Sequence, residues 1–223
     1  MDSKINDYLK LNSLFEENGF KLYLVGGTVR DYLLDIELTD MDAVTDATPE
    51  EMKAFLNDAD YTFSKYGSVT IKFDKKVKFD ITTMRAETSY LDARHPSKIE
   101  FIKDLSRDVK RRDFTINALY LDRDLTVIDY VGGQKDLEKR LLRMVGDPQK
   151  RLKEDPLRII RAIRFAADYQ LSLDKSLEQA ILDNKKELDN LNPEKIKQDI
   201  AKCKVDDKSI VLQYLTKFNI KLD

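Results

Sequence analysis

Two glycines and an arginine near the N-terminus are of the residue types that bind phosphate. Gly26 and Gly27 follow an apolar run over residues 20–25 that is rich in strand-forming side chains. Glycines let the backbone turn sharply and approach a ligand closely, and the helix predicted over 28–34 would present its first N–H groups to an anion. Arg30 adds a bidentate donor. A glycine pair after a strand is more often a plain turn, so this group alone indicates a phosphate site only weakly.

Carboxylates of the kind that hold metal ions follow the glycine pair. Asp40 and Asp42 are two residues apart, so both side chains point to one face of the strand predicted over 40–45. Hard oxygen ligands on one face suit Mg²⁺, which takes a few carboxylates together with substrate phosphates. An Asp-x-Asp pair is most often solvated, but beside a phosphate cradle it favours phosphoryl transfer at a nucleotide site.

A third carboxylate, Asp80, lies in a run over 76–83 in which polar and apolar residues alternate. The alternation predicts a strand with Asp80 on its polar face. There Asp80 would assist the metals or deprotonate a hydroxyl group. An exposed acid at the edge of the sheet is the equally open alternative.

A second motif spans residues 111–119 and reads Arg-Arg-Asp-Phe-Thr-Ile-Asn-Ala-Leu. Arg112 is suited to phosphate. Asp113 and Asn117 are four residues apart, so they would share one face of a helix and read sugar hydroxyls. Three apolar members are expected in the core: Phe114, Ile116 and Leu119.

A third motif spans residues 154–166, where Asp155 is a fitting N-cap for a helix. At helical spacing one apolar arc forms from Ile159, Ile160, Ile163, Ala166 and Ala167. Arg158 and Arg161 gather with Asp155 on the opposite side, and Arg164 lies at its edge. An ordinary amphipathic helix is the alternative. The long polar side chains there are all arginine, however, in a chain whose surface otherwise favours lysine.

The three motifs together resemble the class II tRNA nucleotidyltransferase (CCA-adding enzyme) and bacterial poly(A) polymerase family. Residues 111–118 match the family pattern Arg-Arg-Asp-Phe-Thr-x-Asn-Ala at all eight positions. The resemblance implies an α/β (α+β) fold: a polymerase-beta-type head with a mixed sheet over 1–145 and an all-helical neck over 146–223. It also implies template-independent addition of C and A, from CTP and ATP, to the 3′ end of tRNA.

The resemblance implies roles for individual residues. Asp40 and Asp42 would hold two Mg²⁺ ions. The phosphates would be bound by Gly27, Arg30 and Arg112, with Gly26 in the same turn. Asp155 and Arg158 would choose the base, and Arg161 and Arg164 would support them and the triphosphate.

Further elements must position these groups. Additional helices are predicted over 5–15, 48–57, 134–140, 176–191, 193–202 and 208–218, and strands over 61–73 and 125–131. Residues 74–76 are expected to form a turn. The polar segment 87–96, which contains the single histidine His95, resembles the family's flexible loop.

Composition narrows the class of protein. Charged residues make up 36% of the chain, no apolar run could span a bilayer and no secretion leader opens it, so we expect a soluble cytoplasmic protein. Cys203 has neither a disulfide partner nor zinc-ligand spacing around it.

Charge is distributed unevenly along the chain. Residues 1–93 hold 11 Lys/Arg and 18 Asp/Glu, whereas residues 94–164 hold 18 Lys/Arg and 12 Asp/Glu. An acidic part beside a basic part suits an enzyme that handles nucleotide and RNA, although solvated charge is the simpler alternative.

Two departures and three alternatives remain. Asp35 stands where the family usually has a glycine, and the family continues through a body and tail that grip the tRNA, which this sequence does not reach. A poly(A) polymerase would share the motifs, as would A-only or CC-only enzymes, although the segment 87–96 argues against CC-only addition. An RNA-binding module with an inactive head is the non-enzyme alternative, against which Asp40 and Asp42 argue.

Overall fold

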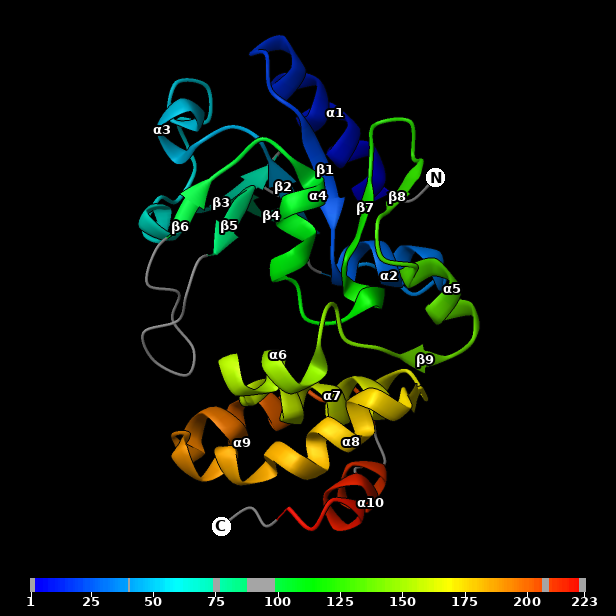
Figure 1. Cartoon of the computed structure of the whole chain (residues 1–223). Helices are drawn as coiled ribbons and strands as arrows, with labels where there is room; N and C mark the ends of the chain where they lie inside the picture. Colours follow the sequence, from blue (N-terminus) through cyan, green and yellow to red (C-terminus); the bar gives the residue numbers. More distant parts are fainter. Residues whose placement is uncertain (1–2, 40, 74–76, 88–98, 206–208, 221–223) are drawn as a thin grey trace. The chain divides into compact units, whose positions relative to one another are not determined.

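The computed structural model describes residues 3–39, 41–73, 77–87, 99–205 and 209–220 (Figure 1). Asp40, the predicted turn at 74–76, and nearly all of the predicted loop at 87–96, with His95, lie outside these residues. The chain divides into two compact units. The sheet unit contains residues 1–88, 98–112 and 116–133, and the helical unit contains residues 89–97, 113–115 and 134–223. The predicted head and neck domains, divided at 145/146, stay a prediction.

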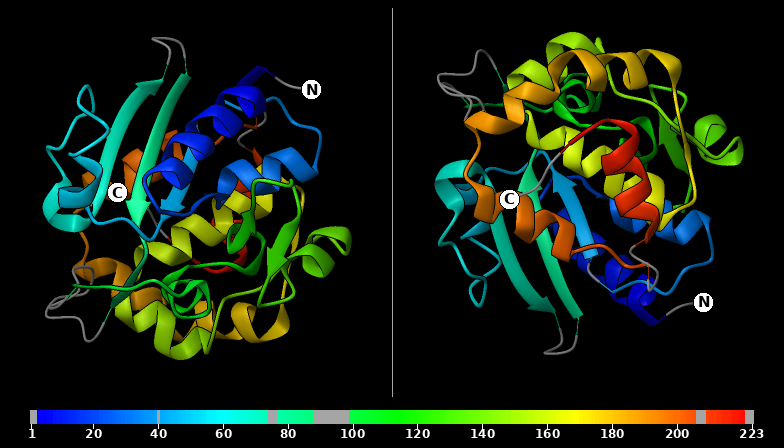
Figure 2. Two further views of the ribbon diagram at one scale, coloured as in Figure 1. Left: turned by 90° about the horizontal axis from the view of Figure 1, so that it is seen from above. Right: turned by 90° about the horizontal axis from the view of Figure 1, so that it is seen from below.

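A six-stranded mixed sheet organises the sheet unit, in the order β3-β4-β2-β1-β7-β8 (Figures 1 and 2). Its strands are β1 (Leu22–Val25), β2 (Met41–Thr45), β3 (Ser68–Phe73), β4 (Val77–Thr83), β7 (Leu119–Leu121) and β8 (Val127–Asp129). β2 and β4 are parallel, and the other neighbours are antiparallel. A separate antiparallel pair consists of β5 (Arg85–Glu87) and β6 (Ile99–Phe101). The expected mixed sheet is confirmed.

Alternation along β4 gives the sheet one apolar and one polar face. Val77, Phe79 and Ile81 are buried, whereas Lys78 is exposed and Asp80 is half-buried. The strand predicted over 61–73 is only half right, because β3 begins at Ser68. Residues before it turn through a short 3₁₀ helix, η1 (Ser64–Tyr66), which ends at Gly67 with a φ of 82°.

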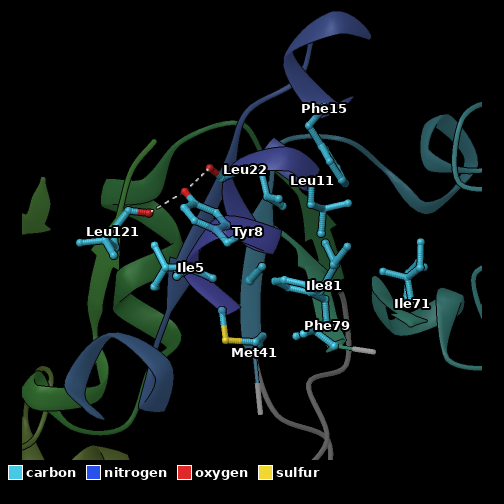
Figure 3. Packing of buried hydrophobic residues seen from close by; sticks show 14 of the residues in the cluster. Ile5, Tyr8, Leu11, Phe15, Leu22, Met41, Ile71, Phe79, Ile81 and Leu121 are labelled. Atoms are coloured by element: carbon cyan, nitrogen blue, oxygen red, sulfur yellow. Dashed lines mark hydrogen bonds between the residues drawn. The ribbon is translucent and has the colours of Figure 1, made fainter. Parts of the chain in front are cut away.

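The apolar face is covered by α1 (Ser3–Glu17), which extends the predicted helix by a few residues at each end. The Tyr8 hydroxyl lies 3.2 Å from the carbonyl oxygen of Leu22 and 3.1 Å from that of Leu121 (Figure 3). Asn12 Nδ2 donates to the same Leu22 oxygen at 2.7 Å. α1 therefore packs on the sheet and also joins β1 to β7 through buried polar groups.

The other helices of the sheet unit are short. They are α2 (Gly27–Leu33), α3 (Pro49–Met52), α4 (Leu105–Asp108) and the 3₁₀ turn η2 (Val109–Arg111). α3 starts at a capping box between Thr48 and Glu51, but the helix predicted over 48–57 ends five residues early. After α2, Asp35 has a φ of 53°, a conformation that glycine adopts without strain.

The helical unit is built around α7 (Leu157–Asp168), which packs against α6, α9 and α10. The predicted apolar arc of α7 is buried throughout. The other elements are α5 (Gly133–Glu138), α6 (Pro148–Glu154), α8 (Lys175–Asn184), η4 (Lys185–Asn190), α9 (Pro193–Ala201), α10 (Ser209–Lys217) and the parallel pair β9 (Leu141–Leu142) and β10 (Ser172–Leu173). The helix predicted over 176–191 changes to 3₁₀ geometry after Asn184. Within the described ranges, no helix is long and apolar enough to cross a membrane.

Candidate active site

The turn between β1 and α2 has the geometry that the glycine pair predicts. Gly26 has a φ of 68° and a ψ of −129°, a conformation closed to other residues without strain. Its N–H donates to the carbonyl oxygen of Leu119 at 3.2 Å, which fastens the turn to β7. α2 begins at the next residue, Gly27, so the N–H groups of its first turn come directly after the bend at Gly26.

Arg30 lies under this turn and is only 3% exposed. Its Nε and Nη2 donate to Oδ1 of Asp31 at 2.9 and 2.8 Å, and its Nη1 donates to Oδ1 of Asn117 at 2.5 Å. A Cβ placed on Gly27 would lie 3.3 Å from Arg30 Nη2, so this glycine leaves room for the guanidinium. Arg30 therefore supports the turn from beneath, and its predicted contact with phosphate stays a prediction.

Arg112 approaches the same turn from the second motif. A Cβ on Gly26 would lie 3.9 Å from its Nη1. The opposite edge of the guanidinium is held by Asp108, whose Oδ2 accepts from Nε at 3.1 Å and Nη2 at 2.8 Å. The Tyr120 hydroxyl donates to the same oxygen at 2.9 Å.

Asp108 is fully buried, and Arg111 Nε donates to its Oδ1 at 2.7 Å. Burial alone would raise the pKa of this carboxyl group, but the charges of Arg112 and Arg111 outweigh burial and hold the pKa well below its ordinary value. The buried carboxylate is therefore ionised and fixes the orientation of Arg112.

Two of the three predicted carboxylates lie side by side in the sheet. Asp42, exposed on β2, is in register with Asp80 on the neighbouring strand β4. Asp80 also accepts from Thr70 Oγ1 at 2.6 Å and from Lys78 Nζ at 2.8 Å. Because β4 lies between β3 and β2, Asp80 is not an acid at the edge of the sheet.

The N–H of Asp42 donates to Thr28 Oγ1 at 2.8 Å, which joins β2 to the first turn of α2. Within the described residues no group of three or more His, Cys, Asp or Glu side chains is assembled as a metal site. Asp42 and Asp80 nevertheless supply two hard oxygen ligands on one face, and this donor set fits Mg²⁺.

The second motif does not form the predicted helix. Arg112, with a φ of −70° and a ψ of 158°, is extended and ends η2, and a separate 3₁₀ turn, η3, covers Thr115–Asn117. The expectation that Asp113 and Asn117 share a helix face is therefore wrong. Asn117 belongs to the sheet unit and Asp113 to the helical unit. The expected burial of Phe114, Ile116 and Leu119 is confirmed.

Asp113 is paired with Arg161 of α7, whose Nε donates to Oδ2 at 2.9 Å and whose Nη2 contacts the same oxygen. Burial would raise the pKa of Asp113, but the Arg161 charge outweighs it and the pKa is lowered. The Arg161 guanidinium also lies over the Phe165 ring, 5.4 Å from its centroid. Arg161 thereby ties the second motif to the third.

In the third motif, Asp155 Oδ1 accepts the N–H of Leu157 at 3.2 Å, as a capping carboxylate does, although the helix boundary itself falls at Pro156. Arg158 Nε lies 3.9 Å from Asp155 Oδ2. Arg158 is only 6% exposed, and its Nη1 donates to the carbonyl oxygen of Arg151 at 2.8 Å.

Arg164 is also buried and donates from Nε to Asp199 Oδ1 at 2.8 Å. Arg158 and Arg164 are therefore not part of a solvated basic face, which the alternative of an ordinary amphipathic helix would require. Their predicted roles with the base and triphosphate stay predictions.

The sequence reasoning missed three residues that shape this site: Thr28, Asp108 and Tyr120. Asp108 had a usable signal, since it precedes Arg112 by four residues, the spacing of a helical ion pair. The side chains of Thr28 and Tyr120 carried none, because each meets its partner, the Asp42 N–H or the Asp108 carboxylate, only after separate elements have packed together.

Comparisons with known proteins agree with the fold. The family model described as "Poly A polymerase head domain" matches residues 22–143. The curated CCA-adding enzyme of Lactobacillus helveticus is 42% identical over 187 residues, which is 84% of this chain and 47% of the relative. The CCA-adding enzyme of Bacillus licheniformis is 39% identical over 191 residues, which is 84% of this chain and 48% of the relative. The chain spans about half the length of the curated relatives that it matches.

Solved structures give the same result. The Bacillus stearothermophilus CCA-adding enzyme in complex with CTP has a TM-score of 0.90 and 31% identity, covering 99% of this chain and 54% of that one. The Thermotoga maritima CCA-adding enzyme, complexed with tRNA, has a TM-score of 0.79 and 25% identity, covering 99% and 52%.

Proposed function

This chain belongs to the poly A polymerase head-domain family, and from that premise we propose that it transfers CMP and AMP from CTP and ATP to the 3′ end of tRNA. The observation that carries the proposal is the register of Asp42 and Asp80 beside the Gly26 turn that Arg112 approaches. Carboxylates next to a glycine turn and an arginine are the parts that nucleotidyl transfer needs. Relatives named for CCA addition, and related structures solved with CTP and with tRNA, support the choice of substrates.

In this reaction the RNA 3′-hydroxyl oxygen bonds to the α-phosphorus of the nucleotide, the bond to pyrophosphate breaks, and the hydroxyl proton is released. Arg112 and the turn at Gly26 and Gly27 would bind the triphosphate oxygens. Asp42, with Asp40, would hold two Mg²⁺ ions, and Asp80 would assist them or accept the proton. When bound, the ions would activate the hydroxyl group and neutralise charge on the leaving pyrophosphate.

The helical unit would choose the base. Asp155 accepts hydrogen bonds and Arg158 donates them, so a pair of this kind matches the amine donor and ring-nitrogen acceptor that cytosine and adenine share. We assign residues 1–145 to a catalytic head and 146–223 to a neck with this task. A cytoplasmic location goes with the proposal, because tRNA and nucleoside triphosphates meet there.

The test incubates two acceptors, a tRNA that lacks its CCA end and a tRNA that ends in CC, with Mg²⁺ and one labelled nucleotide at a time. CCA addition predicts two C residues from CTP on the first acceptor and one A from ATP on the second. A long tail from ATP would indicate a poly(A) polymerase. Transfer of C without any transfer of A would indicate a CC-only enzyme, and transfer of A alone, to the acceptor that ends in CC, would indicate an A-only enzyme. Binding without transfer would indicate an inactive RNA-binding head.

A further inference from the structure

Two lysines lie on the polar face of the sheet beside the carboxylates. Lys72 of β3 is directly opposite Lys78 of β4, and the next rung on the same face contains Thr70, Asp80 and Asp42. The bond between Thr70 and Asp80, and the ion pair between Lys78 and Asp80, confirm that these side chains share one face. Both lysines are exposed.

Like charges directly opposite on antiparallel strands destabilise a sheet. Lys78 is partly compensated by Asp80, but Lys72 adds a second positive charge to the same rung. Nothing in the packing requires this pairing, because the buried residues of β3 and β4 point to the other face. The lysine rung is therefore a candidate for binding an anion.

The order of the strands indicates which anion. β2, with Asp42, lies between β1 and β4. β1 ends at the Gly26 turn, and the lysine rung lies at the same end of the sheet on β4 and β3, because β2 and β4 are parallel while β1 and β3 run opposite to them. The carboxylates thus separate the proposed triphosphate site on the β1 side from the lysines on the other side.

An in-line displacement places the attacking oxygen and the leaving group on opposite sides of the phosphorus. If the triphosphate is bound on the β1 side, the attacking RNA hydroxyl must arrive from the β4 side. Neighbouring strands are only ~4.8 Å apart, so the lysine rung is within one or two strand spacings of Asp42.

We propose that Lys72 and Lys78 bind the last phosphodiester groups of the RNA 3′ strand and so guide its terminal hydroxyl group toward Asp42 and Asp80. The proposal rests on the function proposed above and adds the direction from which the RNA enters. The reacting atoms are not touched by the lysines, which are positioning residues for the RNA.

The test compares two acceptor-stem RNAs that differ only in their last two linkages, which are phosphodiester in one and neutral methylphosphonate in the other. The variants are Lys72→Gln and Lys78→Gln, singly and together, which keep a polar side chain, one atom shorter, and remove its charge. The matched control is Lys10→Gln, which removes the same charge from an exposed position on α1, the helix that covers the opposite face of the sheet.

We expect the unchanged protein and the Lys10→Gln variant to bind the phosphodiester RNA more tightly, by roughly two- to fivefold for each exposed charge pair. The double lysine variant should bind both RNAs equally. Its slope of log affinity against log salt should be shallower by about 0.7 for each lost contact with single-stranded RNA. Affinity for CTP should stay the same in every variant.

The proposal would be overturned if the double variant prefers the phosphodiester RNA over the methylphosphonate RNA by the same factor as the unchanged protein does. A fall in CTP affinity in the lysine variants would also overturn it, since the lysines would then serve the triphosphate. A protein that binds CTP but neither RNA would instead overturn the proposed tRNA substrate, and the lysine assignment with it.

Discussion

Arg30 and Asn117 are joined by a buried hydrogen bond of 2.5 Å, although 87 residues separate them in the sequence. The bond links the first motif, which turns at Gly26, to the second motif, which carries Arg112. Because both partners lie under the turn, the turn and the approaching arginine are held as one piece within the sheet unit. Asn117 therefore has a structural role, which is to hold Arg30 in place.

We expect Asn117→Ala to lower the free energy of unfolding by about 1–3 kcal/mol, because a buried guanidinium loses one acceptor. Asn117→Asp is the matched control, since it keeps an acceptor for Arg30 and should retain most of the stability. Urea unfolding followed by circular dichroism measures both. An equal loss in the two variants would show that side-chain packing, not this bond, matters at the position.

Acid should remove the stabilisation that Asp108 provides. Its pKa in the folded chain lies below the ordinary value of 3.8, so its contribution is complete above about pH 4 and is lost as the pH falls toward the folded pKa. Asp108→Asn should lower the free energy of unfolding by about 3–5 kcal/mol at pH 7, because it removes one partner from a buried ion pair. It should also flatten the pH dependence below pH 4.

Asp124→Asn, at an exposed loop position, is the control for Asp108→Asn and should leave both the stability and its pH dependence unchanged. If Asp108→Asn does not fold, Tyr120→Phe removes one donor to the same carboxylate and keeps the ring. The free energy of unfolding of Tyr120→Phe would then be measured against pH. If the loss of stability in acid has the same size and the same midpoint pH as in the unchanged protein, the role given to the bonds around Asp108 is contradicted.

Asp35 tests the strain at the end of α2. Its φ of 53° is reached by glycine at little cost, and Asp35 stands where relatives of this family were expected to have glycine. Asp35→Gly should therefore raise the thermal midpoint slightly, by an amount equivalent to about 0.5–1 kcal/mol. A lower midpoint would mean that the Asp35 side chain makes a stabilising contact that outweighs the backbone strain.

The parts of the fold that the sequence predicted well are those with a local signal. The alternation around Asp80 fixed both the strand and its polar face, and the glycine pair located the turn after β1. The apolar arc of α7 was fully predictable because its period matches a helix. The strand predicted from residue 61 failed because strand-forming side chains there precede Gly67, whose left-handed conformation closes a 3₁₀ turn.

What could not be predicted depends on contacts between distant residues. Asp113 pairs with Arg161 across 48 positions of sequence. Its four-residue spacing from Asn117 suggested a helix, but Phe114 between them pairs with Met144 in an isolated antiparallel bridge. The burial of Arg158 and Arg164 also depends on contacts that local sequence does not reveal. Their partners, the Arg151 carbonyl group and Asp199, meet them only after α6 and α9 have packed on α7.

We expect Asp42→Asn to reduce CMP transfer to tRNA by at least about 100-fold, since it removes the negative charge of a metal ligand and keeps the shape of the side chain. Asp42 is exposed on its strand, so the circular dichroism spectrum should not change. The same result is expected for Asp40→Asn. Transfer near the original rate in either variant would refute the metal assignment.

Asp155→Asn separates helix capping from base selection. On their Watson–Crick edges, cytosine and adenine share an exocyclic amine donor beside a ring-nitrogen acceptor, an arrangement that uracil and guanine lack on that edge. A carboxylate can only accept and a guanidinium can only donate, so Asp155 and Arg158 together would match cytosine or adenine and oppose the other two bases.

Asparagine also caps helices well, so in the Asp155→Asn variant the bond to the Leu157 N–H should survive and the thermal midpoint should stay unchanged. The amide can now donate as well as accept, and because a charge-assisted bond contributes ~1.5–3 kcal/mol, preference for CTP and ATP over UTP and GTP should fall roughly tenfold or more. Incorporation of all four nucleotides by the variant measures this preference, and unchanged selectivity at an unchanged midpoint would mean that the base is read by other residues.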